Sequence, residues 1–297
     1  MKYRVTHKTK YSGDQPVSVC HNEACLKPRE TPYQHIDAHQ LSSAPQPTSQ
    51  AQRQDYFQNN VWAFSFSSGY DEMTVASICD VTLSERMIPP LSQSPAWEQV
   101  VSRLCNPMSE ADRAACEFTF ESSRCVGNAE LTEYARQSFP SGRPVLEALA
   151  ELTSRIFHDF KYDPRATTVT TRVEDAFRMR KGVCQDFAHV QIAALRSLGL
   201  AARYVSGYLR TRPVPGKPRL IGADASHAWL SVYVGDGDWF DLDPTNNVFP
   251  SLEHITVAWG RDYGDVCPLK GVFIGGGRLK LDVSVDVAQI AADGSLV

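Results

Sequence analysis

The stretch that decides the fold runs from residue 182 to residue 199 and reads GVCQDFAHVQIAALRSLG. Its apolar residues recur at the spacing of a helix that buries one face. These residues are Phe187, Ala188, Ile192, Leu195 and Leu198. Gly199 stands where a glycine commonly ends a helix. The pattern therefore predicts an amphipathic helix with Cys184 at or near its first turn.

A cysteine in this position has chemical advantages that a cysteine inside a helix lacks. Unpaired backbone N–H groups and the positive end of the helix dipole converge at a helix N-terminus. A thiolate is stabilised there and is more nucleophilic at neutral pH. The same N–H groups can hydrogen-bond the oxyanion of an acyl-transfer intermediate. The alternative is a core cysteine that packs the helix on a sheet, and the position of Cys184 alone does not separate the two.

Two strands farther along the chain supply a candidate base and a candidate carboxylate. His227 begins one apolar strand, and Asp243 ends the next. A three-residue loop at 235–237 makes His227 and Asp243 diagonal neighbours on one sheet face, about 7–8 Å apart at Cα. A loop of two or four residues places them on opposite faces. Asp241 shares that face but lies two residues farther from His227, so Asp243 is the better candidate.

These motifs resemble those of the transglutaminase-like superfamily, in particular its bacterial branch, whose members are often labelled cysteine proteases. The resemblance is carried by GVCQDFAH (182–189), GLAARYVSGY (199–208), HAW (227–229) and DPT (243–245), continued by HITVAWGRDY (254–263). It implies a papain-type triad of Cys184, His227 and Asp243. It also implies a papain-like core, in which a helix packs on an antiparallel sheet. The N-terminal part resembles the β domain that precedes this core.

The periodicity along the chain predicts an α+β protein. The first ninety residues alternate in short segments separated by turn residues, which favours a small antiparallel β-sandwich. Prolines 89, 90 and 95 mark a boundary, and a helical period follows from about residue 96 to residue 160. Strands come next, and the alternating segment 279–290 is expected to close the sheet of the core. We therefore predict an N-terminal β domain at 1–90, and a helical segment plus the cysteine-triad core at 91–297.

Composition narrows the function classes. The chain of 297 residues has 30 basic and 34 acidic side chains, a net charge of −4. The pI near 6.1 argues against a nucleic-acid binder. The N-terminus has no signal-peptide pattern, and no run of about 18 apolar residues predicts a membrane span. We therefore expect a cytoplasmic protein with reduced cysteines, no nucleic-acid or membrane partner, and a peptide or protein substrate; the oligomeric state stays open.

The sequence also contains one candidate set of metal ligands. Cys20 and Cys25 precede His35 and His39 in a zinc-like order, but the gap is shorter than the roughly twelve residues of a finger, and the region alternates as strands do. No loop carries the dense acidic spacing of a calcium site. The expected chemistry needs no metal or organic cofactor, so none is predicted.

Other polar and aromatic residues near the motifs are assigned structural roles. His189 points away from the thiol on a regular helix, and Asp186 suits a capping role near the helix start. Trp229 and Tyr208 are expected in the core. Tyr162 and the segment 261–263 could approach the cleft, but the sequence does not place them. We expect loops such as 211–224 to shape the substrate pocket, and the sequence does not show their path.

The sequence thus predicts thiol-dependent acyl transfer on a peptide or carboxamide, by a protease, an amidase or a transglutaminase-type enzyme. Cys184 would attack the carbonyl, His227 would move the proton, and Asp243 would orient the imidazole. The alternative is a non-catalytic binding or scaffolding module that retains the fold. A binding role does not need a nucleophile, so the intact set of three residues favours the enzyme.

Overall fold

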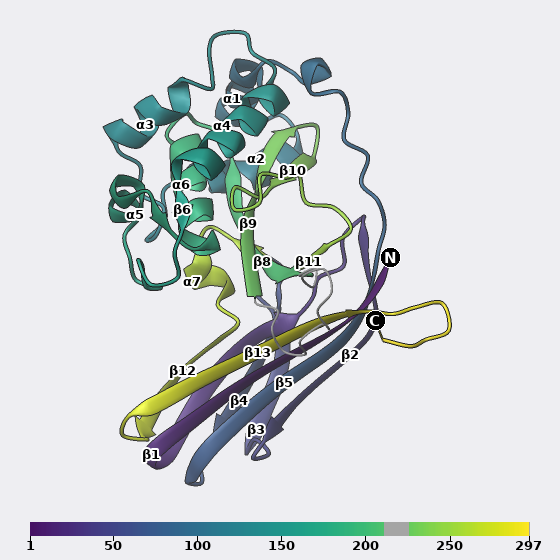
Figure 1. The fold of residues 1–297 in the computed structure, drawn as a ribbon, viewed down its shortest axis with the longest axis vertical. Coiled ribbons are helices and arrows are strands. Elements are labelled where there is room, and N and C mark those ends of the chain that lie inside the picture. The colour runs from purple at the N-terminus through teal and green to yellow at the C-terminus, as the bar shows by residue number, and fades with distance from the viewer. Residues whose placement is uncertain (211–225, 297) are drawn as a thin grey trace, which may run out of the picture.

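The computed structural model describes residues 1–210 and 226–296 of the chain. Figure 1 shows a large curved antiparallel sheet and, beside it, helices gathered around a smaller sheet. The fold is α+β, as predicted. The strands of the large sheet are β1 (Lys2–Lys27), β2 (Gln34–Ala44), β3 (Ser49–Gln54), β4 (Asn60–Phe66), β5 (Tyr70–Leu83), β12 (Leu269–Gly275) and β13 (Leu279–Gln289).

The helices and the remaining strands lie between β5 and β12 in the chain. The helices are α1 (Trp97–Cys105), α2 (Glu110–Cys116), α3 (Ala129–Arg136), α4 (Val145–Asp159), α5 (Val173–Met179), α6 (Cys184–Arg196) and α7 (Tyr263–Val266). The strands are β6 (Lys161–Tyr162), β7 (Lys181–Gly182), β8 (Ala202–Leu209), β9 (Ser226–Gly235), β10 (Asp238–Leu242) and β11 (His254–Gly260). Within the described residues, no helix combines the length and apolar character needed to cross a membrane.

The large sheet has two halves that share β1, with the first part of this strand in one half and its last part in the other. Residues 3–12 pair with β13 and β5, and residues 20–24 pair with β12 and β4. Apolar side chains of both halves meet in one buried cluster, which includes Phe64 from β4 and Val75 from β5. The seven strands are hydrogen-bonded into one sheet because β1 continues from one half into the other, and both halves contribute to this cluster.

The C-terminal strands differ from the expectation in their partner. Segment 279–290 forms a strand, but this strand pairs with β1 rather than with the sheet of the core. Alternation predicts that one face of a strand is buried, and it does not say which sheet the strand joins. The large sheet thus takes strands from both sides of the predicted boundary at residue 90, and both termini lie beside it (Figure 1).

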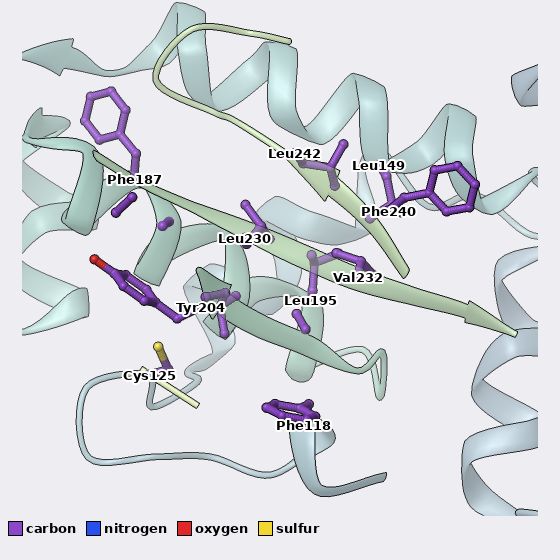
Figure 2. Close-up of a cluster of buried hydrophobic side chains, with 14 of the residues drawn as sticks. Phe118, Cys125, Leu149, Phe187, Leu195, Tyr204, Leu230, Val232, Phe240 and Leu242 are labelled. Atoms are coloured by element: carbon purple, nitrogen blue, oxygen red, sulfur yellow. The ribbon is translucent and has the colours of Figure 1, made fainter. Parts of the chain in front are cut away.

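The smaller sheet has the strand order β10-β9-β8-β11 and is antiparallel throughout. Helix α6 packs on β9 and β8, as the apolar face of its sequence predicts. Figure 2 shows this interior, where Phe187 and Leu195 of α6 belong to the same buried cluster as Leu230 and Val232 of β9. The packing fixes the direction of α6 against the sheet, and with it the position of Cys184.

Strand β11 is an edge strand, and two amide side chains of the N-terminal region pair with its backbone. Gln34 accepts a hydrogen bond from the N–H of Thr256 at 2.8 Å and donates to its carbonyl at 2.7 Å. Asn59 does the same with Trp259, at 3.0 and 2.8 Å. Because an exposed edge presents unpaired backbone groups, these bonds satisfy part of β11 and hold it to the N-terminal part.

Candidate active site

The site begins at the first residue of α6. Cys184 follows Val183, which has extended backbone angles and precedes the helix. The carboxylate of Asp186 accepts hydrogen bonds from the Val183 N–H at 2.8 Å and from the Thr167 hydroxyl at 2.6 Å. A Cβ at position 182 would lie 2.4 Å from that carboxylate, so Gly182 leaves room for this cap. Asp186 therefore has the capping role that the sequence predicts, and it fixes the first turn around the thiol.

The hairpin of β9 and β10 has the predicted register. Phe240 pairs with Val232 and Asp241 with Ser231, as a loop at 235–237 requires. The loop itself differs in detail: Gly235 pairs with Asp238, and a bulge before Trp239 restores the register. Positive φ angles at Asp236 and Gly237 (55° and 89°) make the two-residue turn, which a glycine accommodates easily.

This register brings His227 and Asp243 together. Nε2 of His227 lies 2.7 Å from Oδ2 of Asp243. The side chain of Asp243 is fully buried, and that of His227 is 9% exposed. Cys184, at the start of α6, is near enough to His227 to raise the pKa of the imidazole. Because Nε2 faces the carboxylate, Nδ1 is the ring nitrogen left for the thiol. The structure thus brings the three residues that the sequence selects into one site, where the start of the helix meets the hairpin.

The site strongly favours the charged form of the imidazole. Burial lowers the pKa of His227, but hydrogen bonds and charge interactions with Asp243 and Cys184 outweigh it and raise the pKa to about 10. Burial acts to raise the pKa of Asp243, yet its bonds to His227 and His254 hold that pKa below its usual range. A carboxylate therefore faces an imidazolium in a site with little water, where their attraction is strong.

Asp243 has further partners that the sequence analysis missed. Its Oδ2 accepts from His254 at 3.0 Å and from the Asn246 side chain at 2.7 Å, and its Oδ1 accepts the N–H groups of Thr245 and Asn246 at 2.9 and 3.2 Å. The turn after Asp243 gave a signal for the Oδ1 bonds, since an aspartate often bonds the N–H two residues on. His254 gave none, because it comes from β11, across the sheet.

The packing around His227 requires one glycine. Trp229 is fully buried, and its ring lies 6.0 Å from the His227 ring, nearly parallel to it. Gly207 faces His227 on the neighbouring strand. A Cβ there would lie 2.5 Å from the Trp229 ring and 2.1 Å from the carbonyl oxygen of Ile255. Gly207 therefore lets β11 and Trp229 approach closely enough to confine the imidazole.

The sequence also singled out residues other than Cys184, His227 and Asp243. His189 is packed in the core as expected, and its Nε2 accepts the N–H of Tyr263 at 3.2 Å. Burial lowers the pKa of His189 to about 3, so it is neutral. Tyr162 is about half exposed, and burial together with the charge of Cys184 raises its pKa. The loop 211–224, which we expected to shape the substrate pocket, lies outside the described residues.

One group of side chains has metal-binding geometry. The ligand atoms of His227, Asp243 and His254 lie within 4.8 Å of one another, and in the described part of the chain no other set of three His, Cys, Asp or Glu does so. These atoms already hydrogen-bond one another, so a bound ion would break the His227–Asp243 bond. Cys20 and Cys25 are buried and His35 is exposed, and they form no such cluster with His39.

Two family models match the chain. Residues 132–244 match the transglutaminase-like superfamily, and residues 3–82 match the bacterial transglutaminase-like N-terminal region. Uncharacterized proteins of Mycobacterium tuberculosis and Mycobacterium bovis are 38% identical over 300 residues, which cover 98% of this chain and 94% of each relative. A protein-glutamine gamma-glutamyltransferase of Pseudomonas aeruginosa is 27% identical over 121 residues, 40% of this chain and 18% of that protein.

A solved structure shares the fold. It is described as a "Putative Cysteine Protease" from Cytophaga hutchinsonii, with a TM-score of 0.75 and 20% identity, and the match covers 100% of this chain and 93% of that one. The relatives, the two family matches and the shared fold agree with the motifs around Cys184, His227 and Asp243. The chain therefore belongs to the transglutaminase-like superfamily, a family of thiol-dependent enzymes, and carries the bacterial N-terminal region of that family.

Proposed function

We propose that this protein is a cysteine-dependent acyl-transfer enzyme that acts on the carbonyl of a peptide or carboxamide. Cys184 is the nucleophile, His227 is the general acid and base, and Asp243 orients the imidazole. The observation that carries the proposal is the 2.7 Å hydrogen bond between His227 and the buried Asp243, with Cys184 near enough to His227 to raise its pKa. A structural cysteine would not need a charged imidazole and a buried carboxylate behind it.

In the proposed reaction, the Cys184 sulfur adds to the substrate carbonyl carbon and forms a tetrahedral oxyanion. The backbone N–H groups of Cys184 and Gln185 have no hydrogen-bond partner among the described residues, and we assign the Cys184 N–H as one donor to that oxyanion. His227 then gives its proton to the leaving nitrogen, the carbon–nitrogen bond breaks, and a thioester remains. Water or an amine, deprotonated by His227, attacks the thioester and releases the thiolate.

Glutamine-containing peptides or proteins are the first substrates to consider. The Pseudomonas relative is named for transfer at protein glutamine, and it aligns with the core of this chain. Cys184 is partly exposed, so an extended side chain such as that of glutamine could reach the sulfur. A cytoplasmic location, with no nucleic-acid or membrane partner, stays our expectation.

The test is to trap the acyl-enzyme. The protein is incubated with a blocked glutaminyl-glycine peptide and with p-nitrophenyl esters, and intact and peptide masses are measured with and without hydroxylamine. We expect a thioester on Cys184 that is lost in Cys184→Ala and persists in Cys116→Ala, another partly exposed thiol. Without hydroxylamine, transfer of the acyl group to added putrescine would indicate transamidation, and free acid alone would indicate hydrolysis. No Cys184 adduct with any donor would favour the binding module.

A further inference from the structure

Four side chains stack between the two parts of the molecule, away from Cys184. The guanidinium carbon of Arg29 lies 3.6 Å from the ring centroid of Trp259. Arg203 lies 3.8 Å from Trp259 and 4.1 Å from Trp239. The stack therefore alternates cation and ring, with Arg203 between two tryptophans. Arg29 comes from the N-terminal part, and the other three residues come from the small sheet.

The two arginines of the stack differ in their hydrogen bonds. Arg29 donates to the carbonyl of Phe57 at 2.8 Å and to Oδ1 of Asn59 at 2.7 Å. Arg203 donates no hydrogen bond and has no ion pair within the described residues, and its Nε is buried without a partner. A guanidinium has five N–H donors, and leaving a buried donor unpaired costs about 1–3 kcal/mol. Ring faces stabilise the charge of Arg203 but accept none of its in-plane hydrogen bonds.

Arg203 lines a cavity of about 310 Å³ between the small sheet and the N-terminal part. Other residues around this cavity are Tyr33, Trp239, His254, Thr256 and Trp259. The size suits a small molecule, and the walls combine aromatic rings with hydroxyl groups. Cys184 is not among its lining residues, so the cavity is separate from the site of the thiol.

We infer that this cavity binds a small carboxylate whose two oxygens accept hydrogen bonds from the terminal N–H groups of Arg203. A guanidinium and a carboxylate match in a planar, two-bond geometry. The second arginine of the cavity, Arg86, is occupied, because it donates to the carbonyl of Trp239 and lies 4.0 Å from Asp241. Asp238 and Asp241 line the cavity together with Arg86 and Arg203, so its fixed positive and negative charges are equal in number, and a ligand with one negative charge is favoured over a phosphate dianion.

The surroundings of Arg203 disfavour its charge. Burial lowers the pKa of Arg203 to about 9, although Asp241 acts in the opposite direction. A carboxylate bonded to the guanidinium would favour its charged form. The ligand would also lie near the proposed active site, since His254 lines the cavity and bonds Asp243.

Binding is measured on the full chain by tryptophan fluorescence, because Trp239 and Trp259 line the cavity. Acetate, succinate and glutamate are titrated against phosphate and chloride at constant ionic strength. We expect a saturable change with the carboxylates, unaltered in Cys184→Ala, and a weaker response to phosphate. Tighter binding of phosphate than of any carboxylate, or no saturable response to the carboxylates, would overturn the inference.

Variants of Arg203 test whether the fluorescence change comes from binding at this arginine. Arg203→Gln should weaken carboxylate binding at least tenfold, and Arg203→Lys should weaken it too, because lysine lacks the planar fork. Arg180→Gln is the matched control: Arg180 also stacks on aromatic rings and has a buried unpaired nitrogen, but it does not line this cavity. Equal affinity in the Arg203 and Arg180 variants would contradict the assignment.

If Arg203→Gln does not fold, the site is tested by crystallography instead. A crystal of Cys184→Ala is soaked in 3-bromopropionate to see whether its carboxylate binds at Arg203. An anomalous bromine peak in the cavity, with the carboxylate on Arg203, is the expected result. A cavity without the ligand at a concentration that saturates the fluorescence change would overturn the inference.

Discussion

Two buried histidines beside β8 show how a partner, rather than burial, sets the charge of an imidazole. His7 bonds the Tyr208 hydroxyl and the Thr9 hydroxyl, both at 2.9 Å, and it is 2% exposed. With only neutral partners, burial lowers its pKa to about 4. His227 is nearly as buried, but a carboxylate and a thiol raise its pKa to about 10. Neutral His7 hydrogen-bonds the large sheet to the small sheet, whereas His227 carries a positive charge.

The two histidines therefore have different roles, His7 in the contact between β1 and β8 and His227 in the candidate active site. A neutral histidine bonded to hydroxyls adds specificity to the contact between β1 and β8 without a charge to solvate. A charged histidine between a carboxylate and a cysteine favours a thiolate, which is the reactive form. Variants that remove one side chain at a time, near His227 or at His7, test this difference.

The largest effect is expected from Cys184→Ala, which removes the group that His227 serves and leaves both histidines in place. Turnover of any substrate should fall by about four orders of magnitude or more, as loss of a covalent nucleophile does. Stability should change little, because the thiol is partly exposed. Steady-state kinetics and thermal denaturation measure the two. A large drop in melting temperature with residual turnover would mean that Cys184 is structural.

Asp243→Asn should make the surroundings of His227 resemble those of His7. Without the carboxylate, burial dominates, and the pKa of His227 should fall from about 10 to below its ordinary value near 6.5. Turnover should fall by about 10⁴-fold, by analogy with serine proteases that lose the triad carboxylate. NMR titration of the labelled imidazole and kinetics measure these effects.

The matched control for this variant is Asp241→Asn. Asp241 lies two residues before Asp243, on β10, and accepts the indole N–H of Trp229 at 3.3 Å, but it has no bond to His227. It should lower turnover by less than about threefold, a change of roughly 0.6 kcal/mol in the barrier. Equal losses in the two variants would remove Asp243 from its proposed role.

A smaller effect is expected from His254→Gln, which removes one donor from Asp243 and leaves the His227 bond in place. A hydrogen bond to a charged group contributes about 1.5–3 kcal/mol, so we expect roughly a tenfold loss of kcat or somewhat more. As a positioning residue, His254 should also shift the pH profile of kcat/KM, which a purely structural defect would leave unchanged. An unaltered profile with normal kcat would exclude His254 from the site.

His7→Gln should affect stability alone. The folded pKa of His7 is about 4 and the ordinary value is about 6.5, so protonation favours the unfolded chain, and the stability due to neutral His7 is lost as the pH falls from 6.5 to 4. In the variant, the loss of unfolding free energy between pH 7 and pH 5 should be smaller by about 2 kcal/mol. Urea denaturation at both pH values measures it. An unchanged pH dependence would mean that His7 is accessible to protons in the folded state.

The sequence predicts those parts of the site that depend on local periodicity. The helical period places Cys184 at the start of α6, and the two-residue period of β9 and β10 gives the register that pairs His227 with Asp243. The family resemblance then selects these three residues. Each of these inferences needs only the residues between 182 and 245, so no distant contact could alter them.

Features that depend on distant contacts could not be predicted. The alternation of segment 279–290 shows a strand but not that its partner is β1, some 270 residues earlier. His254 and Arg203 reach their positions through β11 and β8, whose neighbours are set by the fold. Gln34 and Asn59 resemble any other polar residues near a turn, and their bonds to the edge of β11 appear only in three dimensions.

The most direct test of the central claim is the pH profile of iodoacetamide alkylation at Cys184, followed by peptide mass spectrometry, with the exposed Cys105 as internal reference. If His227 and Asp243 hold a charged pair with the thiol, the rate at pH 6 should stay within about tenfold of the rate at pH 9. In His227→Ala it should fall by a few hundredfold over that range, as for an ordinary thiol that titrates near pH 8.5. The same steep profile in the wild-type protein, unchanged in His227→Ala, would contradict the account.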